Sequence, residues 1–296
     1  MARVLLLVTG AMEERALARS LAACFPAHEF TCKPRLDGFT SSRLPPDFAT
    51  LNETERKLLN VDKFIKSIIG AVAPGGRRDI PRPDFVLAIE DLELLNADAP
   101  ENITRTVRDG MLRNLAAWSA DSRLINAIQT RCSFHLMAPM TEAYFFAEPA
   151  AFARATAPGP DRPSKFDPTR TDSESFQADD PDYLTPSDLP KKDHAWRRAN
   201  RRVHPKHYLE YLTDPQLDNN PRYDETTLGR DALVELRWAS MLTAFPTALR
   251  FARSLFADLA DMLGEAPAGC SLEELDAGDC HPLTWPPPRA PVLRNL

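Results

Sequence analysis

Residues 5–17, LLLVTGAMEERAL, decide the fold class. The segment runs from a continuous apolar stretch through a Thr-Gly turn into a helix-forming sequence with two adjacent acids, Glu13 and Glu14. A buried parallel strand is a continuous apolar run, and the ligands of open α/β sheets lie beyond the carboxyl ends of the strands. The order of strand, turn and acids therefore predicts a strand-helix unit whose carboxylates face a cleft. The alternative is that both glutamates are solvated residues of a first helical turn, which the helix dipole favours.

The alternation of strand and helix continues to about residue 156. Further strands are expected at residues 28–34, 83–93 and 132–140. Residues 51–72 and 102–118 have apolar residues at helical spacing. We therefore expect an α/β domain over residues 1–156, with a doubly wound, mainly parallel sheet flanked by helices.

The rest of the chain divides by composition. Residues 157–192 are rich in Pro, Asp and Ser and poor in aliphatic side chains, which predicts a linker or a long surface loop. Residues 193–264 are expected to form a C-terminal helical region, in which Pro246 breaks the longest periodic stretch, 227–263. Residues 265–296 are predicted to be an extended tail.

Bulk properties limit the function classes. The net charge of −6 gives no whole-molecule attraction to a polyanion, so nucleic acid is neither implied nor excluded. The five cysteines are odd in number and have no CxxC spacing, which is typical of free thiols in a reducing compartment. No apolar run has the length of a signal-peptide core or a membrane span, so we expect a cytoplasmic protein with no membrane partner.

A second acidic stretch follows the strand expected at residues 85–89. Asp91 and Glu93 are alternate residues, which share one face of an extended strand. Two carboxylates on one face repel each other unless a divalent cation lies between them, and a set of oxygen ligands suits Mg²⁺ or Mn²⁺. The alternative is a pair of solvated acids at a strand end.

A third acid, Glu142, comes just after the strand expected at residues 132–140. If the three strands are neighbours, Glu13, Asp91, Glu93 and Glu142 converge on one cleft and supply four carboxylates to a metal site. The alternative for Glu142 is a role in the first turn of a helix, where an acid is also favourable.

The order of these motifs resembles the TOPRIM fold in its RloB-like branch. This branch is related to OLD-family nucleases and is largely an uncharacterised domain family linked to phage defence. The resemblance rests on the opening stretch, on Asp-x-Glu at residues 91–93, on EAYFFAEP at 142–149 and on HPKHYLEYL at 204–212. It covers residues 1–156 well and 200–260 loosely.

The resemblance implies Mg²⁺- or Mn²⁺-dependent hydrolysis of phosphodiester bonds in nucleic acid. Glu13 matches the second acid of the family's opening motif, Asp91 and Glu93 match its Asp-x-Asp, and Glu142 matches its late acid. These four carboxylates would hold the metal, and Lys206, which matches the late lysine, would stabilise negative charge on the phosphate.

The sequence departs from the family at its first acid. Thr9 stands where the opening motif has a glutamate, so the resemblance implies one carboxylate fewer, and Thr9 cannot exchange a proton at neutral pH. The alternative function is therefore a catalytically degenerate TOPRIM domain that serves as a nucleic-acid-binding or partner-binding subunit. A third interpretation is a phosphate or metal site of a flavodoxin-like signalling domain.

A basic segment at residues 194–208 supports nucleic-acid binding. Its candidate contacts are Arg197, Arg198, Arg201, Arg202 and Lys206. Cations that alternate with aromatic residues can bind a phosphate backbone and stack on bases. The alternative is a solvated helix surface. The family's genomic setting also implies a protein partner encoded nearby.

Overall fold

The computed structural model describes residues 1–35, 39–45, 50–73, 82–155, 160–185, 200–218, 220–286 and 288–296. Its centre is a four-stranded sheet in the order β2-β1-β3-β4, in which every neighbouring pair is parallel. The strands are β1 (Arg3–Val8), β2 (Glu29–Cys32), β3 (Phe85–Asp91) and β4 (Cys132–Met137). The expected α/β architecture with a parallel sheet is confirmed, and all carboxyl ends of the strands lie at one edge.

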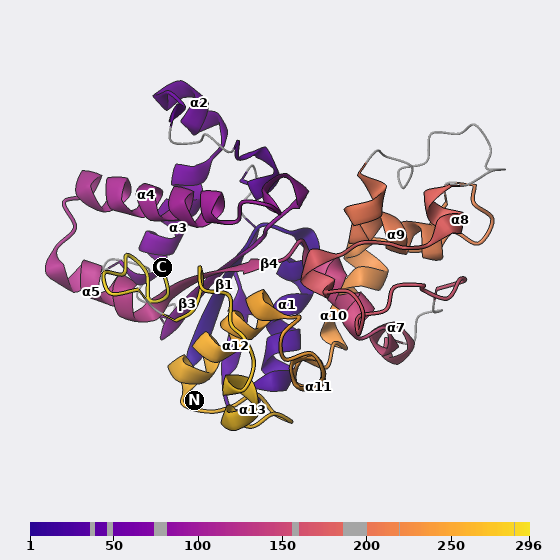
Figure 1. The fold of residues 1–296 in the computed structure, drawn as a ribbon. Helices are drawn as coiled ribbons and strands as arrows, with labels where there is room; N and C mark the ends of the chain where they lie inside the picture. Colours follow the sequence, from indigo (N-terminus) through magenta and orange to yellow (C-terminus); the bar gives the residue numbers. More distant parts are fainter. Residues whose placement is uncertain are drawn as a thin grey trace.

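Helices cover both faces of this sheet (Figure 1). One face packs against α3 (Val61–Val72), α4 (Glu101–Ala117) and α5 (Ser122–Arg131). The other face packs against α1 (Ala11–Cys24) and α12 (Arg250–Leu263). Successive strand residues serve opposite faces: Leu6 belongs to the α1 side of the core and Leu7 to the α3 side. This double burial explains the continuous apolar runs of the central strands β1 and β3.

Two long helices expected from periodicity are divided. The first is split into α2 (Glu53–Leu58) and α3 by Asn60, which adopts a left-handed conformation with φ of 54°. The second becomes four helices: a π-helix (Glu225–Gly229), α10 (Arg230–Val234), α11 (Trp238–Ala244) and α12. The last break, between α11 and α12, contains Pro246 as expected.

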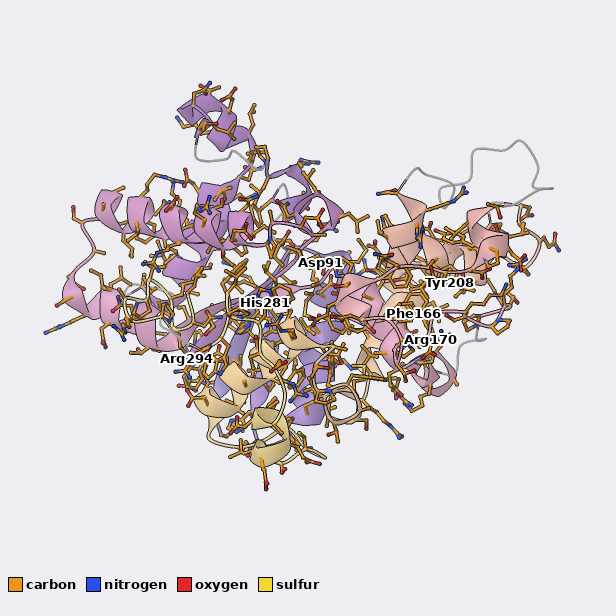
Figure 2. The ribbon with its side chains drawn as sticks, viewed as in Figure 1. Asp91, Phe166, Arg170, Tyr208, His281 and Arg294 are labelled. Atoms are coloured by element: carbon orange, nitrogen blue, oxygen red, sulfur yellow. The ribbon has the colours of Figure 1, made fainter. Side chains whose placement is uncertain are left out.

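Residues 160–185 pack into the core, which differs from the expected linker or surface loop. They contain a short helix, α8 (Pro181–Leu184), and bury Phe166, Phe176 and Tyr183. Phe176 and Tyr183 lie against Tyr208 of α9 (Pro205–Leu212), and Phe166 stacks on Phe176 in the region labelled in Figure 2. Aromatic rings thus supply the apolar surface that this segment buries, although it contains few aliphatic residues.

The same segment also holds the start of α12. The buried carboxylate of Glu174 accepts hydrogen bonds from the amides of Phe251 and Ala252, each at 2.9 Å, and from the hydroxyl of Tyr144. Free amides at a helix start need such an acceptor. Residues 160–185 are therefore part of the folded unit.

Residues 265–296 are docked on the protein where an extended tail was expected. They include α13 (Leu272–Asp276), which begins with a capping box formed by Ser271 and Glu274. Near residue 295 the chain covers the free edge of β4: the amide side chain of Asn295 accepts a hydrogen bond from the Phe134 amide and donates one to the Phe134 carbonyl. Asn295 thus takes the place of a neighbouring strand.

Two expectations from composition concern thiols and membranes. All five cysteines are free, as expected. None of the helices in the described part of the chain combines the length and the apolar character needed to cross a bilayer.

Candidate active site

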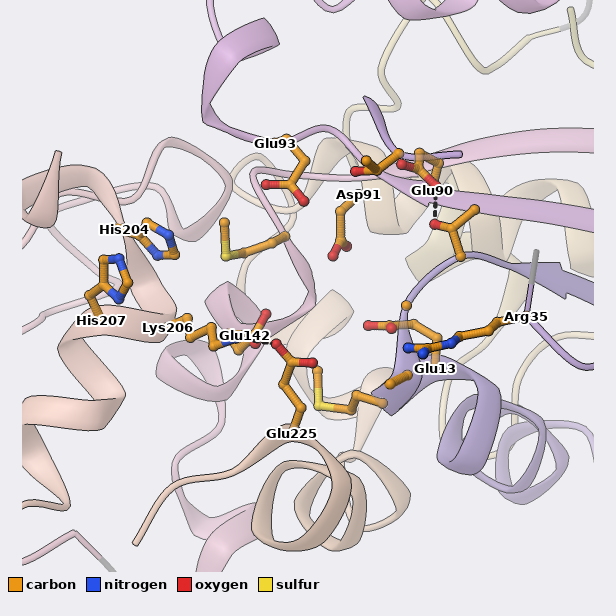
Figure 3. A pocket seen from close by; sticks show the side chains of 16 residues that line it. Glu13, Arg35, Glu90, Asp91, Glu93, Glu142, His204, Lys206, His207 and Glu225 are labelled. Carbon is orange, nitrogen blue, oxygen red and sulfur yellow. Dashed lines mark hydrogen bonds and ion pairs between the residues drawn. The ribbon is translucent and has the colours of Figure 1, made fainter. Parts of the chain in front are cut away.

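A pocket of about 340 Å³ lies at the carboxyl edge of the sheet (Figure 3). The ends of β1, β3 and β4 form one side, and α9 with the π-helix forms the other. All five residues expected to be catalytic line this pocket: Glu13, Asp91, Glu93, Glu142 and Lys206. The parallel order of the strands accounts for this convergence of residues that are far apart in the sequence.

The turn between β1 and α1 sets the place of Glu13. The Glu13 side chain folds back over Gly10, so that a Cβ at position 10 would lie 1.8 Å from Glu13 Oε2. The backbone does not require glycine, since its φ of −82° is open to any residue, but a side chain at position 10 would displace Glu13 from this position. The Thr-Gly turn of the opening stretch therefore makes room for the acid that follows it.

Asp91 is the last residue of β3. Its Oδ1 accepts hydrogen bonds from the backbone amide and the hydroxyl of Thr141, at 3.0 and 3.1 Å. Thr141 lies in the short helix at Thr141–Ala143, after β4. These bonds fix the Asp91 carboxylate between the ends of two neighbouring strands.

Glu93 lines the pocket for a different reason than strand alternation. The strand ends at Asp91, and Glu93 adopts φ 62° and ψ 155°. Residues other than glycine rarely adopt this backbone conformation, which costs about 1–3 kcal/mol. The Glu93 amide donates to the Pro139 carbonyl at 2.7 Å, which holds the strained turn against the chain after β4.

Glu142 reaches the pocket from the short helix after β4, and Lys206 reaches it from α9. Glu142 Oε1 accepts a hydrogen bond of 3.1 Å from the hydroxyl of Tyr223. Lys206, on α9, forms an ion pair with Glu225 of the π-helix. The Glu225 ion pair raises the pKa of Lys206 against the opposing effect of burial, so this lysine is a cation in the pocket.

Glu90 also lines the pocket, although the sequence analysis did not select it. It is 2% exposed, and its carboxylate accepts hydrogen bonds from the Thr9 hydroxyl and, at 2.7 Å, from the Ser41 amide. Val8 pairs with Ile89, so the next residues along β1 and β3 are Thr9 and Glu90. The sequence indicates Glu90 only as a third acid beside Asp91 and Glu93, directly after the apolar run at residues 85–89.

Arg35 and Glu225 line the pocket without having been expected there, and His204 and His207, which belong to the basic segment at 194–208, line it as well. They come from loops and helices whose approach to the strand ends depends on tertiary packing. Lys206, His204 and His207 form the basic side of the pocket, with Glu225 paired to Lys206, while Arg35 lies across the pocket from the histidines, beside Glu13 (Figure 3). The strand ends make the other side acidic.

The acids of the pocket are crowded and buried. Burial raises the pKa of Glu90 and of Glu142 to about 8, and nearby carboxylates add to the effect. Burial also raises the pKa values of Glu13, Asp91 and Glu93; for Asp91, the charges of Glu13, Glu93 and Glu142 follow as causes. A cation between these groups would lower all of these pKa values.

The donors offered to a metal are carboxylate oxygens, which suit Mg²⁺ or Mn²⁺ better than a soft metal. In the described ranges, no three side chains of His, Cys, Asp or Glu are already grouped as ligands around one point. A cation in this pocket therefore requires the glutamate side chains to turn toward it.

The basic segment is only partly within the described residues, and Arg197 and Arg198 lie outside them. Arg201 donates to the Leu184 carbonyl, and Arg202 pairs with Asp179 at 3.1 Å. Both arginines thus tie their short helix (Arg201–Val203) to the segment at 160–185. Lys206 is the residue of this candidate nucleic-acid-binding set that reaches the pocket.

Comparison with known proteins identifies no similar protein. No protein-family profile matches the sequence, and neither the curated proteins nor the solved structures contain a significant match to it.

Proposed function

We propose that the pocket catalyses metal-dependent hydrolysis of a phosphodiester bond in nucleic acid, in the manner of a TOPRIM-type nuclease. The observation that carries the proposal is the convergence of Glu13, Asp91, Glu93 and Glu142 from three strand ends on one pocket. The order of the motifs that supply these acids resembles the RloB-like branch of that fold. The same resemblance favours a role in phage defence with a protein partner encoded nearby, and the cysteine usage favours a cytoplasmic location.

The acidic side of the pocket suits a divalent cation, and the basic side suits a phosphate group. Mg²⁺ or Mn²⁺, when bound, would neutralise charge on the scissile phosphate and activate a water molecule. The carboxylates would hold the ion, and the Thr141 hydrogen bonds keep Asp91 in place for this role. Lys206 stands across the pocket, where an ammonium group stabilises negative charge on a phosphate oxygen.

A second candidate is a catalytically degenerate domain that binds nucleic acid or a partner without cleaving it. The observation in its favour is Thr9 in the position of the first acid of the opening motif. Thr9 donates to Glu90, so the place beside β1 is occupied by a buried, hydrogen-bonded carboxylate from β3.

The decisive experiment measures cleavage of plasmid, single-stranded DNA and RNA with Mg²⁺ and with Mn²⁺. Asp91→Asn should lower the rate by about 100-fold or more because a ligand is lost, while nucleic-acid affinity persists. Asp84→Asn is the matched control, since Asp84 lies next to the opposite end of β3 and its side chain is 47% exposed. Equal cleavage by Asp91→Asn and wild type would overturn the catalytic assignment.

Binding is measured on the same substrates. A wild-type protein that binds nucleic acid and cleaves nothing with either metal would favour the degenerate domain. In that case Lys206→Ala should weaken binding and reduce its salt dependence, because each lost phosphate contact reduces counterion release.

A further inference from the structure

His207 and Glu210 form a buried pair on α9 at the basic side of the pocket. His207 Nδ1 lies 3.0 Å from Glu210 Oε2, and the two side chains are only 5% and 12% exposed. His207 lines the pocket, and its ring stacks on that of His204, with centroids 3.7 Å apart. Figure 3 shows both rings across the pocket from Glu13 and Arg35.

The pair fixes the tautomer of the imidazole. A carboxylate only accepts hydrogen bonds, so Nδ1 carries the proton and Nε2 carries the lone pair when the ring is neutral. His207 Nε2 is buried and has no hydrogen-bond partner among the residues that the structure describes. A buried polar atom without a partner is uncommon, and here it belongs to a side chain that lines the pocket.

This arrangement is that of a general base. A carboxylate that holds one ring nitrogen orients the imidazole and stabilises the imidazolium that forms when the other nitrogen takes a proton. The neighbouring Lys206 on α9 is already paired with Glu225. The strand-end carboxylates are the proposed metal ligands, and His207 is a buried imidazole of the pocket whose other ring nitrogen is held by a carboxylate.

We propose that His207 is the general base of the hydrolysis, with Glu210 as its positioning residue. Nε2 takes a proton from the attacking water as the water oxygen forms a bond to phosphorus. The bond from phosphorus to the leaving oxygen breaks, and that oxygen keeps the electron pair and takes a proton from solvent. His207 then returns its proton to solvent. This inference rests on the proposed function and assigns the proton acceptor of its reaction.

Activity measurements test the role of the imidazole. His207→Ala should lower kcat by about 100-fold or more with little change in KM, and added imidazole should restore part of the rate. His28→Ala is the matched control, since His28 also pairs with a glutamate, Glu265, at 3.2 Å, but precedes β2 at the opposite edge of the sheet. It should keep the wild-type rate and show no response to imidazole.

Several outcomes would overturn the assignment while leaving the proposed hydrolysis intact. One is a wild-type protein that cleaves, an Asp91→Asn variant that does not, and a His207→Ala variant that cleaves as wild type. Loss of activity in a folded His207→Ala variant without rescue by imidazole would also overturn it.

The tautomer can be measured without any substrate, and without the risk that a variant fails to fold. Long-range ¹H–¹⁵N spectra of the wild-type protein should show the neutral ring of His207 protonated at Nδ1. Glu210→Gln should abolish this preference, since a side-chain amide can donate as well as accept. A proton on Nε2 of the neutral wild-type ring would overturn the proposal.

Discussion

The hydroxyl group of Thr9 donates a hydrogen bond to the carboxylate of Glu90, where β1 and β3 end beside each other. The bond joins a residue just beyond β1 to the penultimate residue of β3. Ser41 donates to the other oxygen of the same carboxylate, and Asn96 donates to the Ser41 carbonyl at 2.9 Å. Glu90 therefore links two strand ends to the loops above them.

Thr9→Val should destabilise the protein by about 1–3 kcal/mol, because a buried carboxylate oxygen of Glu90 loses its donor at nearly constant side-chain volume. Thr9→Ser keeps the hydroxyl group and should cost less. Urea denaturation of the three proteins at one pH measures the free energy of unfolding. Equal values for Thr9→Val and wild type would show that the hydrogen bond adds nothing to stability.

Stability should fall as pH rises from about 4.5 to about 8 when divalent cations are chelated. Glu90 and Glu142 have folded-state pKa values near 8 and ordinary values of 4.5, so the folded protein holds protons that the unfolded chain releases. The stabilisation of these protonated groups is complete below pH 4.5 and is lost as pH rises through 8. Urea denaturation in chelator across this range measures the slope.

Glu142→Gln should flatten that slope, because it removes one of the groups whose pKa is raised in the folded protein. Millimolar Mg²⁺ should stabilise wild type more at pH 8 than at pH 5, since metal ligands must be deprotonated. A melting temperature that Mg²⁺ and Mn²⁺ leave unchanged at pH 8 would contradict metal binding at this pocket.

Glu93→Gly and Glu93→Ala should differ in stability although both remove the carboxylate. Glycine adopts the positive φ of position 93 without strain, whereas alanine retains the strain of a Cβ. Glycine also raises the conformational entropy of the unfolded chain, which offsets part of this gain. We therefore expect Glu93→Gly to be more stable than Glu93→Ala by about 1 kcal/mol. Thermal denaturation of the two variants measures the difference, and the reverse order would show that the backbone here is unstrained.

Gly10→Ala should affect activity more than stability. The added methyl group would meet the end of the Glu13 side chain, which can swing away at small cost but then leaves its place in the pocket. We expect cleavage to fall at least as far as in Glu13→Gln, with the melting temperature nearly that of wild type. Gly70→Ala is the control, since a Cβ there meets nothing within 4 Å.

The sequence was most informative where strand and ligand lie close together in the chain. The apolar run before Glu13 and the one before Asp91 predict buried parallel strands, and parallel strands must end at one edge. The meeting of these acids in one pocket followed from that geometry alone. Glu90 was overlooked because neighbours on a strand point to opposite faces, yet Glu90 and Asp91 both line the pocket at the end of β3.

The other side of the pocket could not be predicted in the same way. His207 and Glu225 are brought to the strand ends by α9 and the π-helix, whose positions depend on contacts across the whole chain. Residues 160–185 were expected to be a linker because they contain few aliphatic residues. Their burial rests on a few aromatic rings, such as Phe176, which packs against Phe146 and Tyr208 of other segments.

The pairing of Asn295 with Phe134 has a consequence for synthesis of the protein. The two residues are 161 positions apart, so the edge of β4 emerges from the ribosome long before the side chain that covers it. At roughly 5–20 residues per second, that interval is on the order of ten seconds. During this time the nascent chain exposes an uncovered strand edge to every other nascent chain and chaperone nearby.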